Sequence, residues 1–150
     1  MENNSLGILI NSFDISQLRI SILHNLKRIK DVTPYVFYNE LPEVYLKDLS
    51  FAALSSREAY GFNGYTIATC LHTAKQLLQC PCPTKKFFYM WDFEWMKQQY
   101  NYNVIQEIYL NDDLTLIARS EYHKKLIDNC WKQSIIVEDF NHEQLTRLFK

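Results

Sequence analysis

The sequence has little glycine and proline and no excess of either charge. Of its 150 residues, 3 are glycine and 4 are proline, so the composition of a collagen-like, linker-rich or disordered chain is absent. Lysine and arginine number 16 against 17 aspartates and glutamates, which gives a formal net charge of −1. Proteins that bind the phosphate backbone carry a basic surface excess, so we expect no nucleic-acid partner.

Long hydrophobic runs are also missing. No run approaches the roughly 18 apolar residues of a membrane span, and we expect no such span. The first residues, Met1 to Ser5, do not form a basic segment followed by an apolar stretch, as in a secretory signal. We therefore expect a cytoplasmic protein, whose 4 cysteines are reduced thiols rather than a disulfide framework.

What the sequence does contain is an alternation of apolar runs and helix-patterned segments. With 47% hydrophobic residues, the chain is expected to fold as one domain over residues 1–150 and to bury about 70% of its unfolded surface. Continuous apolar runs are typical of strands buried on both faces. They occur at residues 7–10, 35–38, 51–54, 87–91, 114–118 and 135–137.

Between these runs, apolar residues recur every three or four positions, as on one face of a helix. Asp14, with Gln17 three residues later, has the spacing of a capping box and predicts a helix that carries a stripe from Ile15 to Ile29. A second helix is predicted from Asn63 to Cys80. Two more are expected to begin after Ser120 and after Asn141, and a weakly patterned one spans residues 93–102.

Strands that alternate with helical crossovers of a dozen residues pair in parallel. The sequence therefore predicts an α/β fold of Rossmann-like type, with a doubly wound, mainly parallel sheet and helices on both faces. In such sheets, ligands bind beyond the carboxyl ends of the strands, where the strand order reverses. The loops after the predicted strands are accordingly the place to look for a site.

These loops are rich in carboxylates, carboxamides and aromatic rings. Asp, Glu and Asn side chains can form paired hydrogen bonds with hydroxyl groups, and aromatic rings can pack against the apolar faces of a sugar. The pattern therefore suits a polyhydroxylated ligand. Taken one at a time, the same residue types also serve as helix caps. The loops cover residues 11–14, 39–40, 55–64, 92–95, 119–121 and 138–141.

Motifs for cofactors and metals are weak. The segment from Gly61 to Gly64 lacks the G-x-G-x-x-G pattern and the lysine of a phosphate-binding loop, which favours a turn. Asp92 and Glu94 could hold a divalent cation in an extended segment, and His72 lies near Cys80 and Cys82, but the C-x-C spacing is unlike that of zinc sites. We predict no metal and no cofactor.

A nucleophilic hydrolase is disfavoured too. His123 lies one helical turn beyond Ser120, but on a stretch with Lys124 and Lys125 that is predicted to face solvent. No other serine, cysteine and histidine set has the spacing of a catalytic triad or a zinc-peptidase motif.

Three segments together resemble a known family. A strand ends in an aromatic residue and an aspartate at residues 88–92, an aspartate opens a strand that reaches a serine at 113–120, and a further strand runs into residues 135–141 ahead of a helix. In this order they are similar to the N-terminal Rossmann-like half of GT-B glycosyltransferases. The resemblance implies an acceptor-type half that takes part in the transfer of a sugar from a nucleotide-sugar to an acceptor.

The resemblance also implies a partner. In the family a second domain holds most nucleotide-sugar contacts, and nothing in this sequence replaces it. We therefore expect either self-association or a second polypeptide, through a face that carries the aromatic residues of the strand ends: Phe13, Tyr60, Phe62, Trp91, Trp95 and Phe140. We expect no tight nucleotide-sugar binding by the chain alone.

The predicted site lies at the carboxyl edge of the sheet. Asp92 is the preferred catalytic base, because a carboxylate that follows a buried strand is expected to be desolvated, and Glu58 is the second candidate. The expected substrate-binding residues are Ser12, Phe13, Tyr60, Asn63, Trp91 and Ser120. The alternative is a noncatalytic interaction module of the same fold, whose strand ends would be filled by side chains.

Overall fold

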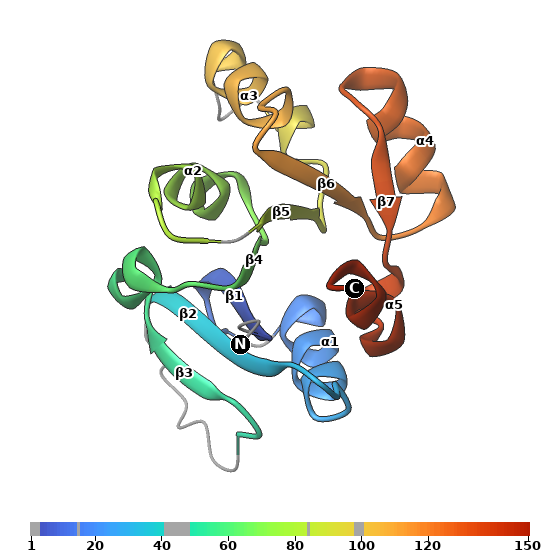
Figure 1. Cartoon of the computed structure of the whole chain (residues 1–150). Coiled ribbons are helices and arrows are strands. Elements are labelled where there is room, and N and C mark those ends of the chain that lie inside the picture. The colour runs from blue at the N-terminus through green and yellow to red at the C-terminus, as the bar shows by residue number, and fades with distance from the viewer. Residues whose placement is uncertain (1–3, 15, 41–48, 84, 98–100) are drawn as a thin grey trace.

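The computed structural model describes residues 4–14, 16–40, 49–83, 85–97 and 101–150. It contains a sheet of seven strands in the order β3-β2-β1-β4-β5-β6-β7, all parallel (Figure 1). This confirms the doubly wound α/β fold. The strands are β1 (Ser5–Ser12), β2 (Thr33–Glu40), β3 (Ala52–Ser55), β4 (Tyr65–Ala68), β5 (Lys85–Met90), β6 (Leu114–Ala118) and β7 (Ser134–Ile136).

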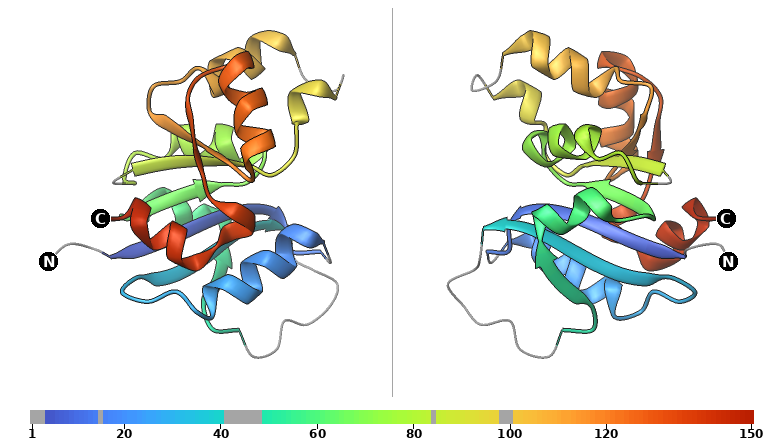
Figure 2. Two further views of the ribbon diagram at one scale, coloured as in Figure 1. Left: turned by 90° about the vertical axis from the view of Figure 1, so that its right-hand side faces the viewer. Right: turned by 60° about the vertical axis from the view of Figure 1, so that its left-hand side comes forward.

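Helices cover both faces of the sheet (Figure 2). Helices α1 (Gln17–Leu26) and α5 (His142–Leu148) pack on one face, and α2 (Leu71–Gln79), α3 (Tyr102–Tyr109) and α4 (Glu121–Cys130) on the other. Strand β5 shows why both faces need cover. Phe87 and Tyr89 lie in the core under α1 and α5, whereas Phe88 and Met90 lie in the core under α2 and α3. Alternate residues of a strand point to opposite faces, so a continuous apolar run supplies both cores.

The helices are short. The longest in the described residues, α1 and α4, have 10 residues each. No helix of the described part of the chain has the length and apolar character needed to cross a bilayer.

One predicted helix is in fact a strand followed by a helix. Residues 65–68 form β4, and α2 begins at Leu71 rather than at Asn63. The Thr73 hydroxyl accepts hydrogen bonds from the backbone N–H groups of Thr69 and Cys70, each at 3.1 Å, and so fixes the start of α2. The prediction was wrong because Ile67 lies four residues before Leu71 and so extends the helical stripe into the strand.

Two other helix predictions need correction. Helix α1 is capped by Ser16, whose hydroxyl accepts from the Arg19 N–H at 3.1 Å, and not by Asp14. Helix α3 starts at Tyr102, the last residue of the segment predicted as a helix. Before Tyr102, the described residues of that segment form only the short 3₁₀ helix η2 (Glu94–Met96), and residues 98–100 lie outside the described part. Helices α4 and α5 begin after Ser120 and Asn141 as predicted.

Candidate functional site

The strand order reverses between β1 and β4. From β1 the chain proceeds to β2 and β3 on one side, then returns to β4 and continues to β7 on the other. The segments that leave β1 and β4 therefore diverge to helices on opposite faces, α1 and α2, which opens a crevice at the carboxyl ends of the two strands. A pocket of about 170 Å³ lies there, lined by Ile10, Asn11, Ser12, Leu18, Thr69, Cys70, Trp91, Asp92, Glu94 and Lys97. We call it the switch-point pocket.

Three of the predicted site residues meet in this pocket. Ser12 ends β1, and Trp91 and Asp92 follow β5. Trp91 is 7% exposed, so only a small part of this residue is available to a ligand. Asp92 is exposed, and the desolvation expected for it after a buried strand is absent.

The other carboxylate of the pocket has a structural partner. The Oε1 atom of Glu94 accepts a hydrogen bond from the backbone N–H of Leu71 at 2.9 Å, at the N-terminus of α2. The carboxylate thus occupies the position at which an anionic ligand would interact with the positive end of the helix dipole. No group of three or more His, Cys, Asp or Glu side chains suited to a metal ion occurs among the described residues.

Thr69 and Cys70 line the pocket where β4 ends. The Thr69 hydroxyl donates to the Leu9 carbonyl at 2.8 Å, so toward a ligand its oxygen can act only as an acceptor. Burial raises the pKa of the Cys70 thiol, although hydrogen bonds with Thr73 oppose the shift. The thiol is therefore protonated at neutral pH and is a poor nucleophile.

Three predicted site residues lie elsewhere. Glu58 and Asn63 line a separate shallow pocket with Ser5, the first residue of β1. Tyr60 donates from its hydroxyl to Gln79 Oε1 at 3.4 Å, and Gln79 ends α2. Placing them at the carboxyl edge was wrong, because the 3₁₀ helix η1 (Ser56–Gly61) and the residues after it return the chain from the end of β3 to the beginning of β4.

Phe13 is a core residue. It is 0% exposed, and its ring lies 6.2 Å from that of Phe51, centroid to centroid. Trp91 and Phe140 are buried as well. The prediction of an exposed aromatic face at the strand ends is therefore wrong for these three rings, which the sheet and the helices α1 and α5 already cover.

Ser120 belongs to a second cluster, at the end of β6. Its Oγ atom accepts from the backbone N–H of His123 at 3.2 Å and lies 2.8 Å from His123 Nδ1. The imidazole packs against Phe93, with the two ring centroids 4.5 Å apart, and His123 is half-buried, whereas the sequence predicted a residue that faces solvent. Burial, and next the charge of Arg119, lower the pKa of His123, which keeps the ring neutral near pH 7. The S-x-x-H spacing at the start of a helix is the sequence feature that indicates the contact between Ser120 and His123.

Arg119 connects this cluster to the turn before α5. Its guanidinium carbon lies 3.7 Å from the centroid of the Trp91 ring, and its Nε donates to Asp139 Oδ1 at 2.6 Å. Asp139 and Phe140 have φ values of 43° and 59°, a left-handed conformation that is uncommon for a bulky residue such as phenylalanine. The buried Tyr89 hydroxyl holds this turn by donating to the Val137 carbonyl and accepting from the Phe140 N–H at 3.2 Å.

Comparison with protein-family models, curated proteins and solved structures found no match to this chain. The doubly wound fold rests on the strand order and the parallel pairing of the chain itself. The likeness to GT-B glycosyltransferases rests on the sequence motifs alone. Because one fold carries many activities, function has to be argued from the residues of the site.

Proposed function

We propose that the chain binds a sugar in the switch-point pocket and acts as the acceptor-type half of a glycosyltransferase. The observation that supports this most is the meeting of Asn11, Ser12 and Asp92, from the ends of β1 and β5, in one pocket beside Trp91. Its volume of about 170 Å³ is well below that of typical drug-sized ligand pockets, roughly 300–1,000 Å³. It suits a single sugar ring better than a dinucleotide.

The pocket offers the polar groups that a sugar ring requires. Asn11 and Ser12 can both donate and accept, the Thr69 oxygen can accept, and Lys97 can donate. Each hydroxyl of a sugar is itself a donor and an acceptor, so the mixed set can pair with several hydroxyls at once. The small exposed part of Trp91 supplies an apolar contact for the C–H groups of the sugar ring.

In the transfer step, the acceptor hydroxyl oxygen attacks the anomeric carbon of the donor as the bond to the nucleotide diphosphate breaks. Asp92 is the general base that accepts the hydroxyl proton, and the departing diphosphate carries the electron pair. The nucleotide part of the donor would be held by a second polypeptide or a second copy of the chain. The neutral His123 imidazole, near the start of α4 after β6, is a second proton acceptor.

A noncatalytic module of the same fold is the second candidate. The buried Phe13, Trp91 and Phe140 fill much of the space at the strand ends, as expected for such a module. A module that recognises saccharides would bind them in the switch-point pocket without transferring them. Binding and transfer must therefore be measured separately.

The first test is saccharide binding by thermal shift, with a panel of monosaccharides and disaccharides. A saccharide at about 100 times its Kd stabilises the native state by about 2.7 kcal/mol, which raises the Tm by roughly 5–10 °C for a chain of this size. Asp92→Asn should abolish the shift and leave the Tm of the free protein unchanged, because Asp92 is exposed.

Asp113→Asn is the matched control, since Asp113 is also exposed but lies just before β6, at the other end of the sheet. It should keep the full saccharide shift. No shift in the wild-type protein, or an equal shift in Asp92→Asn, would refute the proposal. A loss of several kcal/mol of stability in Asp92→Asn with intact binding would make Asp92 a structural residue.

A further inference from the structure

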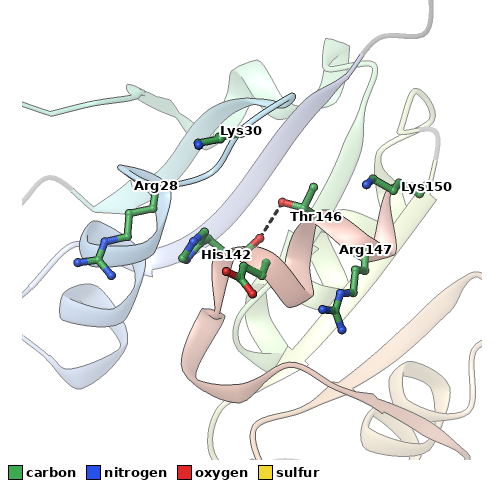
Figure 3. Close-up of a pocket in the computed structure, with 7 residues that line it drawn as sticks. Arg28, Lys30, His142, Thr146, Arg147 and Lys150 are labelled. Atoms are coloured by element: carbon green, nitrogen blue, oxygen red, sulfur yellow. Dashed lines mark hydrogen bonds between the residues drawn. The ribbon is translucent and has the colours of Figure 1, made fainter.

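A second concave surface lies between the end of α1 and helix α5, and it shares no lining residue with the switch-point pocket. It has a volume of about 350 Å³ and is lined by the cationic residues Arg28, Lys30, Arg147 and Lys150 (Figure 3), together with the acidic residue Glu143. We call it the α1/α5 groove. It concentrates positive charge in a chain whose formal net charge is −1.

Among the described residues, none of the four cations belongs to an ion pair. The ion pairs within the described part of the chain are Arg119–Asp139 and Lys124–Asp128, and neither involves the groove. Cations near a helix C-terminus interact favourably with the helix dipole. This interaction explains why a cation is favourable at Arg28 and, separately, at Arg147. It does not explain why cations from two segments more than a hundred residues apart gather around one concavity, because like charges repel.

The two walls of the groove are held together by Asn25. Its Nδ2 donates to the carbonyl oxygens of Ser21 and Asp139, each at 3.0 Å, which orients Oδ1 toward His142. Oδ1 then lies 3.3 Å from the backbone N and 3.4 Å from Nδ1 of His142. Because an amide oxygen can only accept, Nδ1 carries the proton, and Nε2 is the ring nitrogen left for a ligand.

Thr146 is fixed from within α5. Its hydroxyl donates to the His142 carbonyl at 2.7 Å, the bond drawn as a dashed line in Figure 3. Hydrogen bonds therefore hold the end of α1 and the start of α5 in place on the two sides of the groove, and arginine and lysine side chains surround it. This is the combination of fixed frame and cationic donors that recognises phosphate groups.

We infer that the α1/α5 groove binds a small ligand with two linked phosphate groups. The four positive charges of two arginines and two lysines exceed the charge of about −2 that one phosphate group carries near pH 7, and two linked phosphates balance them more closely. The volume of about 350 Å³ falls in the range of small-molecule pockets. Binding to a lipid surface combines cations with exposed apolar side chains. None of the exposed large hydrophobic residues of the described chain lines the groove. The net charge of −1 argues against nucleic acid. The inference is independent of the sugar site.

The test is calorimetric titration of the full chain with inorganic pyrophosphate. The variant Arg28→Gln/Arg147→Gln removes two cations of the groove. The matched control Lys75→Gln/Lys125→Gln removes the same charge from exposed positions on α2 and α4, across the sheet. Loss of charge-assisted hydrogen bonds should weaken pyrophosphate binding at least about tenfold in the groove variant. The control should bind as the wild type does, and inorganic phosphate should bind more weakly than pyrophosphate.

A second groove variant, Lys30→Gln/Lys150→Gln, should also weaken binding, and circular dichroism checks that each variant is folded. Absence of pyrophosphate binding at physiological salt would overturn the inference. So would an equal loss of affinity in groove and control variants, which would indicate a response to net charge alone. Binding of duplex DNA or anionic vesicles that depends on the groove and is tighter than that of pyrophosphate would overturn the assignment to a small ligand.

Discussion

At the scale of single residues, neighbouring side chains of one type have different environments. Asp92 and Glu94 are two residues apart in the loop after β5, yet Asp92 is exposed beside the switch-point pocket while Glu94 accepts from the Leu71 N–H at the start of α2. The sequence places both carboxylates near a site. Which of them is bound to a backbone N–H depends on how β4 and β5 pair, and this information is not local.

Tyr89 is expected to stabilise the turn before α5. In Tyr89→Phe, the Val137 carbonyl loses its donor and the Phe140 N–H loses its acceptor in a buried place. We expect a loss of about 1–3 kcal/mol in the free energy of unfolding, measured by urea denaturation. Tyr122→Phe is the control, since Tyr122 is 67% exposed, and should cost nothing measurable. Equal stabilities of Tyr89→Phe and the wild type would show that the hydroxyl does not hold the turn.

The lowered pKa of His123 gives a pH dependence of stability with a definite sign. Burial disfavours the imidazolium in the folded state, so the unfolded chain binds the proton more tightly. Stability from this group is present above the unfolded pKa of about 6.5 and is lost as the pH falls through that value toward the folded pKa. In His123→Gln, the loss of stability between about pH 7.5 and pH 5.5 should be smaller than in the wild type. An NMR titration that placed the pKa of His123 above its usual value would contradict this.

At the scale of elements, the sequence predicts those whose signals are local. Ser120 and Asn141 cap α4 and α5 as expected, and the long apolar runs mark their strands. The sequence does not predict strand β4, because the strand has only four residues and its apolar residues continue the stripe of the helix that follows. Glu58 and Asn63 were misplaced for a different reason: η1 leads back along the sheet, and only the three-dimensional path of the chain shows this.

The start of β4 gives a test of packing between elements. A Cβ atom added to Gly64 would lie 2.5 Å from the Ser5 carbonyl oxygen and 2.9 Å from the Phe62 ring, whereas one added to Gly61 meets nothing within 4 Å. Gly64→Ala should therefore destabilise the fold by about 1–3 kcal/mol, as overpacking does. Gly61→Ala should not. Similar melting temperatures of the two variants would contradict the close approach of β4 to β1.

At the scale of the whole molecule, the parallel sheet is what brings the predicted site residues together. Ser12, Trp91 and Asp92 meet because β1 and β5 point in the same direction and flank β4. The α1/α5 groove could not be predicted in this way. Its cations are unremarkable in sequence, and they gather only because α5 packs beside α1 on one face of the sheet.

Association with a second chain stays a prediction, and fewer of the expected interface residues now support it. Phe13, Trp91 and Phe140 are buried within the chain, so they cannot form the expected interface. Light scattering tests self-association. A monomer that binds a nucleotide-sugar at micromolar concentration would show that no second domain is needed and would refute the acceptor-half proposal.

The most direct test of the sugar-site proposal is NMR mapping of the isotope-labelled chain during titration with the saccharide that gives the largest thermal shift. We predict that the amide signals of Asn11, Ser12, Thr69 and Asp92 move together with one Kd, and that Asp92→Asn abolishes the movement. Signals that stay fixed at the switch-point pocket, or that move instead around Glu58 and Asn63, would contradict the proposal.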